Sequence, residues 1–455
     1  MPLPPAVPTS RADATSPATA GPPADAASRH GRLADLLVVL LIAYSAKVLS
    51  PDLTPQDFSD IELAAHVAET SESNLLNQLF WLLMGGLAFA AALPAWRRLQ
   101  PLLAGSFFLV ALVALAVASP LWALEPAIAM RRVVQQAIVV FAVFVAAGAS
   151  RSPEHCLRVG YATLGGCLLA YLLSLALPGS FDWRGDFRGI YGDKNGLGGL
   201  AVMALLMGAC LRPTLSSSLG RRLNLVYLAG WLGIAVLSRS KTSLALLAAV
   251  PAIVLALHLA ARATRLSIGL YLTLGLVSAG ALLLFVIAGM GVTPERLLGA
   301  IHVDATFTGR TEIWRFAFAS LAEHWGLGYG YQSFWNAGPH SPNLQAEVEF
   351  IRYLNQAHNG YLDILLALGA VGLSLAVCAL AQAIVNLSRI RLISPVTYWT
   401  GWSLLIFVLM HNLTESSLLR GYSPPWIFLL LSIALASRVA SEHCTEDAER
   451  QGARP

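Results

Sequence analysis

The sequence predicts an all-α, polytopic integral membrane protein with about 12 transmembrane helices and one long external loop that carries short helices. Three observations predict this class. Of the 455 residues, 56% are hydrophobic and only 12% are charged, which is about half the charged share of a soluble domain. The mean hydropathy is +0.63. The apolar residues also gather in runs of about 20, the length that a helix needs to cross a bilayer.

Each predicted helix is one of these apolar runs. In chain order the runs lie at 33–50, 74–94, 101–119, 133–150, 159–178, 197–211, 223–238, 243–261, 266–291, 361–385, 397–412 and 425–440. Residues 1–32 are rich in Pro, Ala and Ser and contain too little apolar surface to fold. We therefore expect a disordered tail over 1–32, a membrane domain over 33–440 and a second tail over 441–455.

Lysine and arginine predict the orientation, because segments that stay in the cytoplasm are enriched in these residues. An even number of spans places both termini on one side. If that side is the cytoplasm, the inside segments are more than twice as dense in Lys and Arg as the outside segments. The long connection 292–360 is then external, and it is the largest soluble segment available to form a site.

The external side nevertheless keeps a few cations close to helix ends. They form three groups, with Arg184, Arg188 and Lys194 in the first, Arg239 and Lys241 in the second, and Arg310 alone in the third. Each one could be an arginine or lysine that reaches to lipid headgroups. Three groups on the depleted side instead favour an anion site, since guanidinium forks match phosphate oxygens. A phosphate-bearing lipid is the expected ligand.

One histidine in this external segment stands among polar neighbours. His358 lies where the loop enters the tenth span, beside Gln356, Asn359 and Asp363. It is either a structural residue or a general base for a hydroxyl, the chemistry for which imidazole is suited. We expect it to be the base, and we expect structural roles for the other three histidines of the loop. These are His302, His324 and His340.

A short helix is predicted in the same loop, over TEIWRFAFASLAEHW, with Thr308 or Thr311 as its cap. Arg310 would then lie at the helix start, where backbone N–H groups also favour an anion. Trp314 is expected to pack in the membrane interface. The GLGYGY run at 326–331 lacks the strand and helix of a nucleotide-binding loop, so we interpret it as a turn.

Two further external segments, 119–132 and 411–422, carry polar groups that include Arg131, Arg132 and Glu415. They either line an acceptor pocket or anchor the chain in the interface. No HExxH sequence and no Cys/His cluster is present, so the sequence predicts neither a metal site nor a cofactor. Scattered basic residues give no nucleic-acid signature.

The ordered motifs SRSKTSLALL at 238, TGRTEIW at 308, HWGLGYGYQSFW at 324 and AHNGYLDILLALGAVGL at 357 resemble the O-antigen ligase and polysaccharide polymerase superfamily of bacterial envelope proteins. The resemblance covers about 119–430, with a core at about 197–385. It implies that Arg239, Arg310 and His358 form the active centre. We expect the other polar residues of these segments to bind substrate, namely Arg188, Lys194, Lys241, Asn359 and Glu415.

The resemblance also implies the reaction and the location. Such proteins take a glycan from undecaprenyl pyrophosphate and transfer it to a sugar hydroxyl, at the periplasmic face of the bacterial inner membrane and without nucleotide or metal. The acceptor is a second glycan or the lipid A core, and a flippase and a chain-length regulator are candidate partners. GIYGDKNGLGG at 189 and NLTESSLL at 412 resemble the exopolysaccharide polymerases of the ExoQ type. We therefore rank a polymerase above a ligase.

A transporter or flippase for lipid-linked sugars is the alternative from another class. Carriers usually place ionisable groups within the membrane, and the predicted spans contain few beyond Lys47 and His258. Neither is there an obvious repetition of the first six spans in the second six, a symmetry that is common among carriers. The sequence therefore favours an enzyme.

Overall fold

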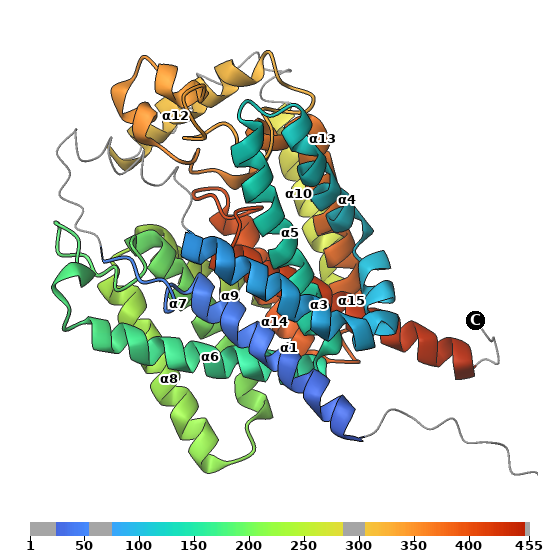
Figure 1. The fold of residues 1–455 in the computed structure, drawn as a ribbon. Coiled ribbons are helices and arrows are strands. Elements are labelled where there is room, and N and C mark those ends of the chain that lie inside the picture. Colours follow the sequence, from blue (N-terminus) through green and yellow to red (C-terminus); the bar gives the residue numbers. More distant parts are fainter. Residues whose placement is uncertain (1–23, 54–74, 285–304, 451–455) are drawn as a thin grey trace, which may run out of the picture.

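The computed structural model describes residues 24–53, 75–284 and 305–450, and in these ranges the chain is helical (Figure 1). The longer helices are α1 (Ala24–Ser45), α3 (Leu75–Ala104), α4 (Phe107–Ala118), α5 (Pro126–Ala149), α6 (Pro153–Ser174), α7 (Lys194–Leu211), α8 (Ser218–Leu237), α9 (Lys241–Thr264), α10 (Ile268–Leu284), α12 (Ala305–Leu321), α13 (Gly360–Arg389), α14 (Pro395–His411) and α15 (Pro424–Arg450). Helices satisfy their own backbone groups, which lipid cannot do. The predicted all-α, polytopic class is confirmed.

Seven of the described helices are long and apolar enough to cross a membrane, namely α3, α5, α6, α7, α9, α13 and α15. The five other predicted runs form the helices α1, α4, α8, α10 and α14, which are shorter or more polar. The chain is thus a multi-pass membrane protein, and the number of 12 spans stays a prediction.

Short polar side chains begin several of these helices. Ser152, Ser217 and Ser240 each accept a backbone N–H of the first turn of α6, α8 and α9. Asp193 accepts the Gly196 N–H at 2.7 Å at the start of α7. Such caps satisfy donors that the helix leaves unpaired. They fix the points at which the chain enters each helix.

Three predicted boundaries differ from the structure. The expected break after residue 94 is absent, because α3 runs through Pro94 and Pro101; membrane helices tolerate proline when neighbouring groups satisfy the freed carbonyls. At the N-terminal side α1 begins at Ala24, inside the expected tail, in a stretch rich in the strong helix former alanine. At the other end α15 continues to Arg450.

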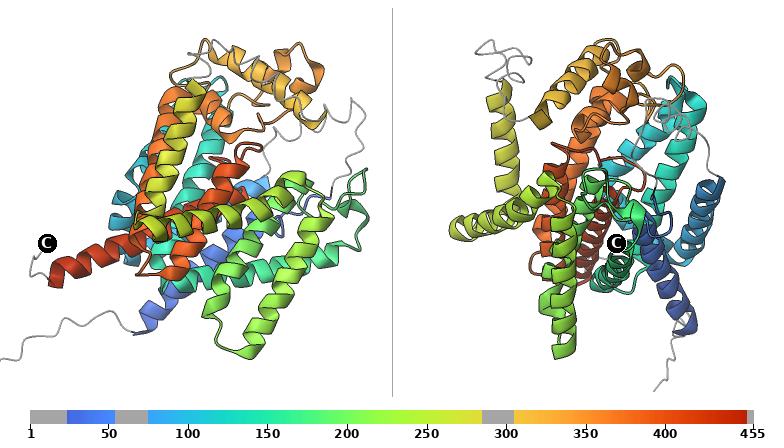
Figure 2. Two further views of the ribbon diagram at one scale, coloured as in Figure 1. Left: turned by 180° about the vertical axis from the view of Figure 1, so that it is seen from behind. Right: turned by 90° about the vertical axis from the view of Figure 1, so that its left-hand side faces the viewer.

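The segment 305–360 gathers at one end of the molecule, away from the start of α1 (Figures 1 and 2). Here α12 buries Ile313, Ala317 and Leu321 in an apolar cluster with Phe334 and Leu362, among others. The helical spacing predicted for this segment is therefore present, and its apolar face packs on the loop and on α13.

The start of α12 differs from the prediction. The helix begins at Ala305, ahead of the proposed caps Thr308 and Thr311. Arg310 therefore lies in the second turn of the helix, so the expected contribution of free N–H groups at the helix start does not apply to it.

The GLGYGY run packs into a break in α13. Gly369 of α13 has a φ of 64°, and a Cβ atom there would lie 2.2 Å from the Gly326 carbonyl oxygen. The backbone groups that this break leaves without helix partners form other hydrogen bonds. The Ala370 N–H donates to the Trp325 carbonyl at 2.8 Å, and the Leu366 carbonyl accepts the Tyr329 N–H at 2.8 Å. The predicted turn thus anchors the external segment to α13.

Candidate functional site

His358 is held by the short loop that leads into α13. Its φ is 50°, a left-handed conformation that a non-glycine residue keeps only where its neighbours are fixed. Both neighbours are fixed. Trp314 Nε1 donates to the Ala357 carbonyl at 2.9 Å, and the Ala357 N–H donates to Asp363 Oδ1 at 3.1 Å. Asn359 Oδ1 accepts two N–H groups of the first turn of α13.

Trp314 and Asn359 therefore have roles that the sequence did not predict. Trp314 was expected in the membrane interface, yet it bonds to the loop that carries the histidine. Asn359 was expected to bind substrate, and the structure uses its side chain as the N-cap of α13. Both contacts position the neighbouring His358.

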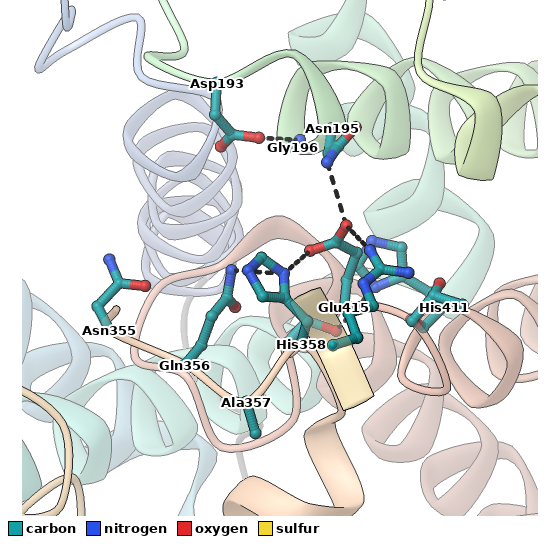
Figure 3. A network of polar contacts seen from close by, with 12 residues as sticks. Asp193, Asn195, Gly196, Asn355, Gln356, Ala357, His358, His411 and Glu415 are labelled. Atoms are coloured by element: carbon teal, nitrogen blue, oxygen red, sulfur yellow. Dashed lines mark hydrogen bonds and ion pairs between the residues drawn. The ribbon is translucent and has the colours of Figure 1, made fainter. Parts of the chain in front are cut away.

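Glu415 is the centre of the polar network around His358 (Figure 3). Its Oε1 accepts from Arg310 Nη2 at 3.2 Å and from Asn195 Nδ2 at 3.1 Å. Its Oε2 lies 3.1 Å from His358 Nδ1. The side chain is only 8% exposed, and a buried carboxylate needs such partners. The network joins segments that are more than 200 residues apart in sequence.

The loop that carries Glu415 is itself built by close contacts. Asn412 Oδ1 accepts the N–H groups of Ser417 and Leu418, and the Gly360 N–H donates to the Asn412 carbonyl at 2.9 Å. A Cβ atom at Gly360 would lie 1.9 Å from Asn412 Oδ1. Only glycine lets the start of α13 approach this loop so closely.

Electrostatics keep Glu415 ionised. Burial alone would raise its pKa, but the hydrogen bond from His358 and the electrostatic interactions with His358, His411 and Arg310 bring the pKa below the usual 4.5. Because a carboxylate only accepts hydrogen bonds, the proton of the His358 ring belongs on Nδ1. In the described part of the chain Nε2 of that ring has no hydrogen-bond partner, so it is the nitrogen able to accept a proton.

A second ion-pair cluster lies on Asp186. Its carboxylate pairs with Lys194 and, at 3.3 Å, with Arg239 Nη1. The hydrogen bond from Lys194 is the main cause that lowers the pKa of Asp186 below its usual value. Arg239 is 68% exposed, so its guanidinium keeps room for another anion. Sequence reasoning missed Asp186, although it stands between two arginines in the segment FDWRGDFRG.

Asn195 links the two clusters. While its Nδ2 donates to Glu415, its Oδ1 accepts from Ser240 Oγ at 3.0 Å. Lys194 precedes Asn195 and Arg239 precedes Ser240 along the chain. Arg310, His358, Glu415, Lys194 and Arg239 thus belong to one network. Asn195 was also missed, although it lies in the segment GIYGDKNGLGG, two residues after the helix cap Asp193.

The other predicted site residues lie apart from this network. Arg188 was expected to bind substrate. It is 2% exposed and donates to the Gly179 and Gly192 carbonyls, each at 3.1 Å, contacts that hold the turn before α7. Lys241 is exposed at the start of α9. Within the described ranges no carboxylate lies within 4 Å of it.

The remaining loop histidines do not reach His358. His340 Nδ1 lies 2.7 Å from Glu125 Oε1, with 75% of its side chain exposed. The His324 ring packs on Tyr329 at a centroid distance of 4.1 Å. His302 lies outside the described residues. Over the described ranges, no group of three His, Cys, Asp or Glu side chains is placed to hold a metal ion.

A cavity of about 720 Å³ borders the network on one side. Glu415, Asn195 and Gln356 belong to its wall. Much of the rest of the wall comes from the ends of α1, α3 and α5 and from the loop before α15, including parts of the 119–132 and 411–422 segments singled out in the sequence. The two segments therefore do meet at a cavity.

The helices and this centre define a class: a multi-pass membrane protein in which the buried Glu415 joins His358 and Arg310 next to a cavity. Residues 225–377 match the family model described as O-antigen ligase. This match confirms the resemblance to the O-antigen ligase and polysaccharide polymerase superfamily. A search of curated proteins finds no match. The matched segment contains Arg239, Arg310 and His358, whereas Glu415 and Asn195 lie outside it.

Proposed function

We propose that this protein polymerises oligosaccharide repeat units carried on undecaprenyl pyrophosphate, into exopolysaccharide or O-antigen, at the periplasmic face of the bacterial inner membrane. The matching family model, described as O-antigen ligase, supports an enzyme that transfers glycans. The polymerase, the lipid-pyrophosphate donor and the residue roles are our proposal. Both termini are placed in the cytoplasm, as the distribution of Lys and Arg favours.

One observation carries the proposal: a single carboxylate, Glu415, contacts both His358 and Arg310. Glu415 orients the imidazole and stabilises the imidazolium that forms when Nε2 takes a proton. Arg310 stays charged at any working pH. A proton acceptor and an anion-binding group are therefore fixed next to each other.

The proposed reaction is a direct displacement. The acceptor hydroxyl oxygen bonds to the anomeric carbon, and the bond from that carbon to the pyrophosphate oxygen breaks. The pyrophosphate leaves with the bonding electron pair, and the hydroxyl proton passes to Nε2 of His358. Arg310 and Arg239, with Lys194 beside them, would stabilise the charge on the leaving group without exchanging a proton. Attack from the face opposite the leaving group inverts the anomeric centre.

Two of the segments that contact one another at the centre also carry the resemblance to polymerases. GIYGDKNGLGG contributes Asn195 and NLTESSLL contributes Glu415, and these two side chains are hydrogen-bonded at 3.1 Å. This supports ranking the polymerase first. The second candidate is a ligase that transfers finished polymer to the lipid A core, because the matching family model is described as O-antigen ligase.

Deletion of the gene in its host tests the proposal. Carrier-linked glycan, secreted polysaccharide and lipopolysaccharide would be extracted, and chain lengths read by gel and mass spectrometry. If the protein is a polymerase, the deletion strain should keep single repeats on the carrier and make no long chains. Long chains that stay on the carrier and are missing from the lipid A core would indicate the ligase. Glycan trapped on the cytoplasmic side would contradict both and indicate a flippase.

A further inference from the structure

We infer that the cavity beside Glu415 is a second anion site, which takes the phosphate-bearing head of the lipid-linked acceptor. This inference rests on the proposed function, in which Arg310 and Arg239 hold the donor. It assigns the acceptor to a different part of the molecule, formed by α1, α3, α5 and the loop before α15.

Four cations line this cavity: Lys47, Arg131, Arg132 and Arg420. In the described part of the chain none of the four lies within 4 Å of a carboxylate, while Lys194, Arg239 and Arg310 all do. Of the two carboxyl groups in the cavity wall, Glu415 is engaged by Arg310 and His358, and Asp193 accepts the Gly196 N–H as the cap of α7. The cavity therefore has an excess of positive charge, which attracts a polyanion.

Backbone contacts fix two of these cations and leave the other two available. Arg132 donates to the Gln332 and Asn336 carbonyls. Arg420 donates to the Asn355 carbonyl and, at 3.2 Å, to Gln356 Oε1. A guanidinium has five N–H donors, so each arginine keeps others for a ligand.

Arg131 is exposed, and Lys47 Nζ lies 5.3 Å from the centre of the Tyr422 ring. In the cavity wall Gln135 Nε2 and Ser416 Oγ are buried without a hydrogen-bond partner among the described residues. Buried polar atoms of this kind usually bond to water or a ligand.

The rim of the cavity indicates that the ligand is a lipid. Leu82 of α3 and Met130 and Val134 of α5 line the cavity, and they are 61%, 48% and 45% exposed on the surface. Both helices are candidate membrane spans, so these side chains would face hydrocarbon. Cations inside and exposed apolar side chains at the rim fit an amphiphile with an anionic head.

The position of the cavity fits an acceptor. Glu415 and Gln356 form part of its wall, and both contact His358 Nδ1. A sugar attached to a head group in this cavity would extend past these side chains towards the histidine. The donor would lie at Arg310, on the other oxygen of the same Glu415 carboxylate. Two substrates could then be held at once, which a displacement reaction between them requires.

The shared chemistry of the ligand is phosphate on a lipid, and it has two possible sources. In a polymerase the acceptor glycan is itself carried on undecaprenyl pyrophosphate. In a ligase the acceptor is the phosphorylated lipid A core. This cavity, the chamber, accepts either chemistry. The two sources are therefore separate arms of the test.

The test counts bound lipids on the full-length protein by native mass spectrometry, with undecaprenyl pyrophosphate and rough-type lipopolysaccharide as the probes. The chamber variant is Lys47→Gln/Arg131→Gln, which removes two charges without touching the backbone contacts of Arg132 and Arg420. The donor variant is Arg310→Ala. Arg315→Gln is the matched control, because Arg315 is exposed on α12 and pairs with Glu312.

For a polymerase we expect two undecaprenyl pyrophosphates on the unchanged protein and on the Arg315→Gln control. The chamber variant should bind the second one at least about tenfold more weakly, since charged hydrogen bonds are lost. For a ligase we expect one undecaprenyl pyrophosphate and one lipopolysaccharide, of which the chamber variant loses the lipopolysaccharide. Either result supports the inference.

Unchanged binding of both probes by the chamber variant would overturn the inference, while loss of one undecaprenyl pyrophosphate from Arg310→Ala would leave the proposed function standing. If the chamber variant loses the only undecaprenyl pyrophosphate that binds, the chamber holds the donor and the inference is wrong. If Arg310→Ala loses nothing and the chamber variant loses one lipid, the chamber stands as a lipid site and the proposed donor clamp is wrong.

Discussion

The two cationic regions of this protein differ in how their charges are balanced. At the centre, Arg310 shares Glu415 with His358, and Lys194 and Arg239 share Asp186. In the chamber, four cations have no carboxylate partner within the described ranges. The centre is thus held in one geometry by its own acids, whereas the chamber needs an anion from outside. Fixed groups suit the chemical step, and an unbalanced charge suits recognition.

Removal of the proton acceptor should have the largest effect on the reaction. His358→Ala should lower the transfer rate by about 10²–10⁴-fold, the usual contribution of a general base. Binding of undecaprenyl pyrophosphate should stay close to that of the unchanged protein, because the proposed donor contacts come from the arginines. Initial rates with purified protein and a lipid-binding titration measure the two effects.

His340→Ala is the matched control for this loss. It removes a histidine of the same external segment that pairs with Glu125 and does not reach His358. A stably inserted His358→Ala protein that makes normal polymer would refute the role of His358.

Removal of the donor contact should have the next largest effect. Arg310→Ala should lower kcat by about 10²–10³-fold, as the loss of one charge-stabilising donor does in other enzymes, and should also raise the donor KM. Arg310→Lys should recover little, because an ammonium cannot replace the guanidinium fork. Steady-state kinetics with varied donor separate the two constants, and an Arg310→Ala protein with an unchanged donor KM would contradict the clamp.

Glu415 acts through His358 and Arg310, so removal of its charge should lower kcat less than the loss of either of these residues. We expect Glu415→Gln to lower kcat by about 10–100-fold, the equivalent of one charged hydrogen bond. Glu415→Asp should recover part of the rate. A Glu415→Asp protein no faster than Glu415→Gln would mean that the carboxylate charge does not act on the reaction and that Glu415 only holds the loop.

The smallest effect is expected at Asp186. Its pKa is lowered below the usual 3.8, so its ion pairs stabilise the fold above that pH and are lost as the pH falls through the lowered value. Asp186→Asn should lower the Tm at neutral pH by only about 1–2 °C, because a partly exposed ion pair contributes little. The difference between the two proteins should vanish at acid pH. A difference that persists there would mean that the variant acts through packing.

Much of the fold followed from the sequence alone. Every apolar run of the prediction lies largely in a helix, because the need to bury backbone polar groups in lipid leaves few alternatives. Boundaries were less predictable. The predicted run ended at residue 94, whereas α3 continues to Ala104, since neighbouring helices and not the local sequence decide whether a membrane helix continues.

The centre was predictable only in part. Arg239, Arg310 and His358 stand in motifs that resemble a family, and the structure brings them into one network. Asp186, Asn195 and the contact of Trp314 with Ala357 were missed. The contacts of Asn195 with Ser240 and of Trp314 with Ala357 join residues more than 40 positions apart in sequence, and no local pattern marks such contacts.

The chamber could not be predicted from the sequence for the same reason. Lys47 lies at the end of one helix, Arg131 in the first turns of another, and Arg420 in a loop nearly 300 residues further on. Each one alone resembles a cation that anchors a helix in the interface. Only the fold places them around one cavity.

The stereochemistry of a single transfer tests the central claim most directly. Purified protein would be reconstituted with a donor of known anomeric configuration, and the new linkage would be determined by NMR, with His358→Ala measured in parallel. Direct attack by the acceptor hydroxyl predicts an inverted linkage that is lost in His358→Ala. Retention of configuration would contradict the account, because it would require a covalent glycosyl intermediate that this mechanism does not contain.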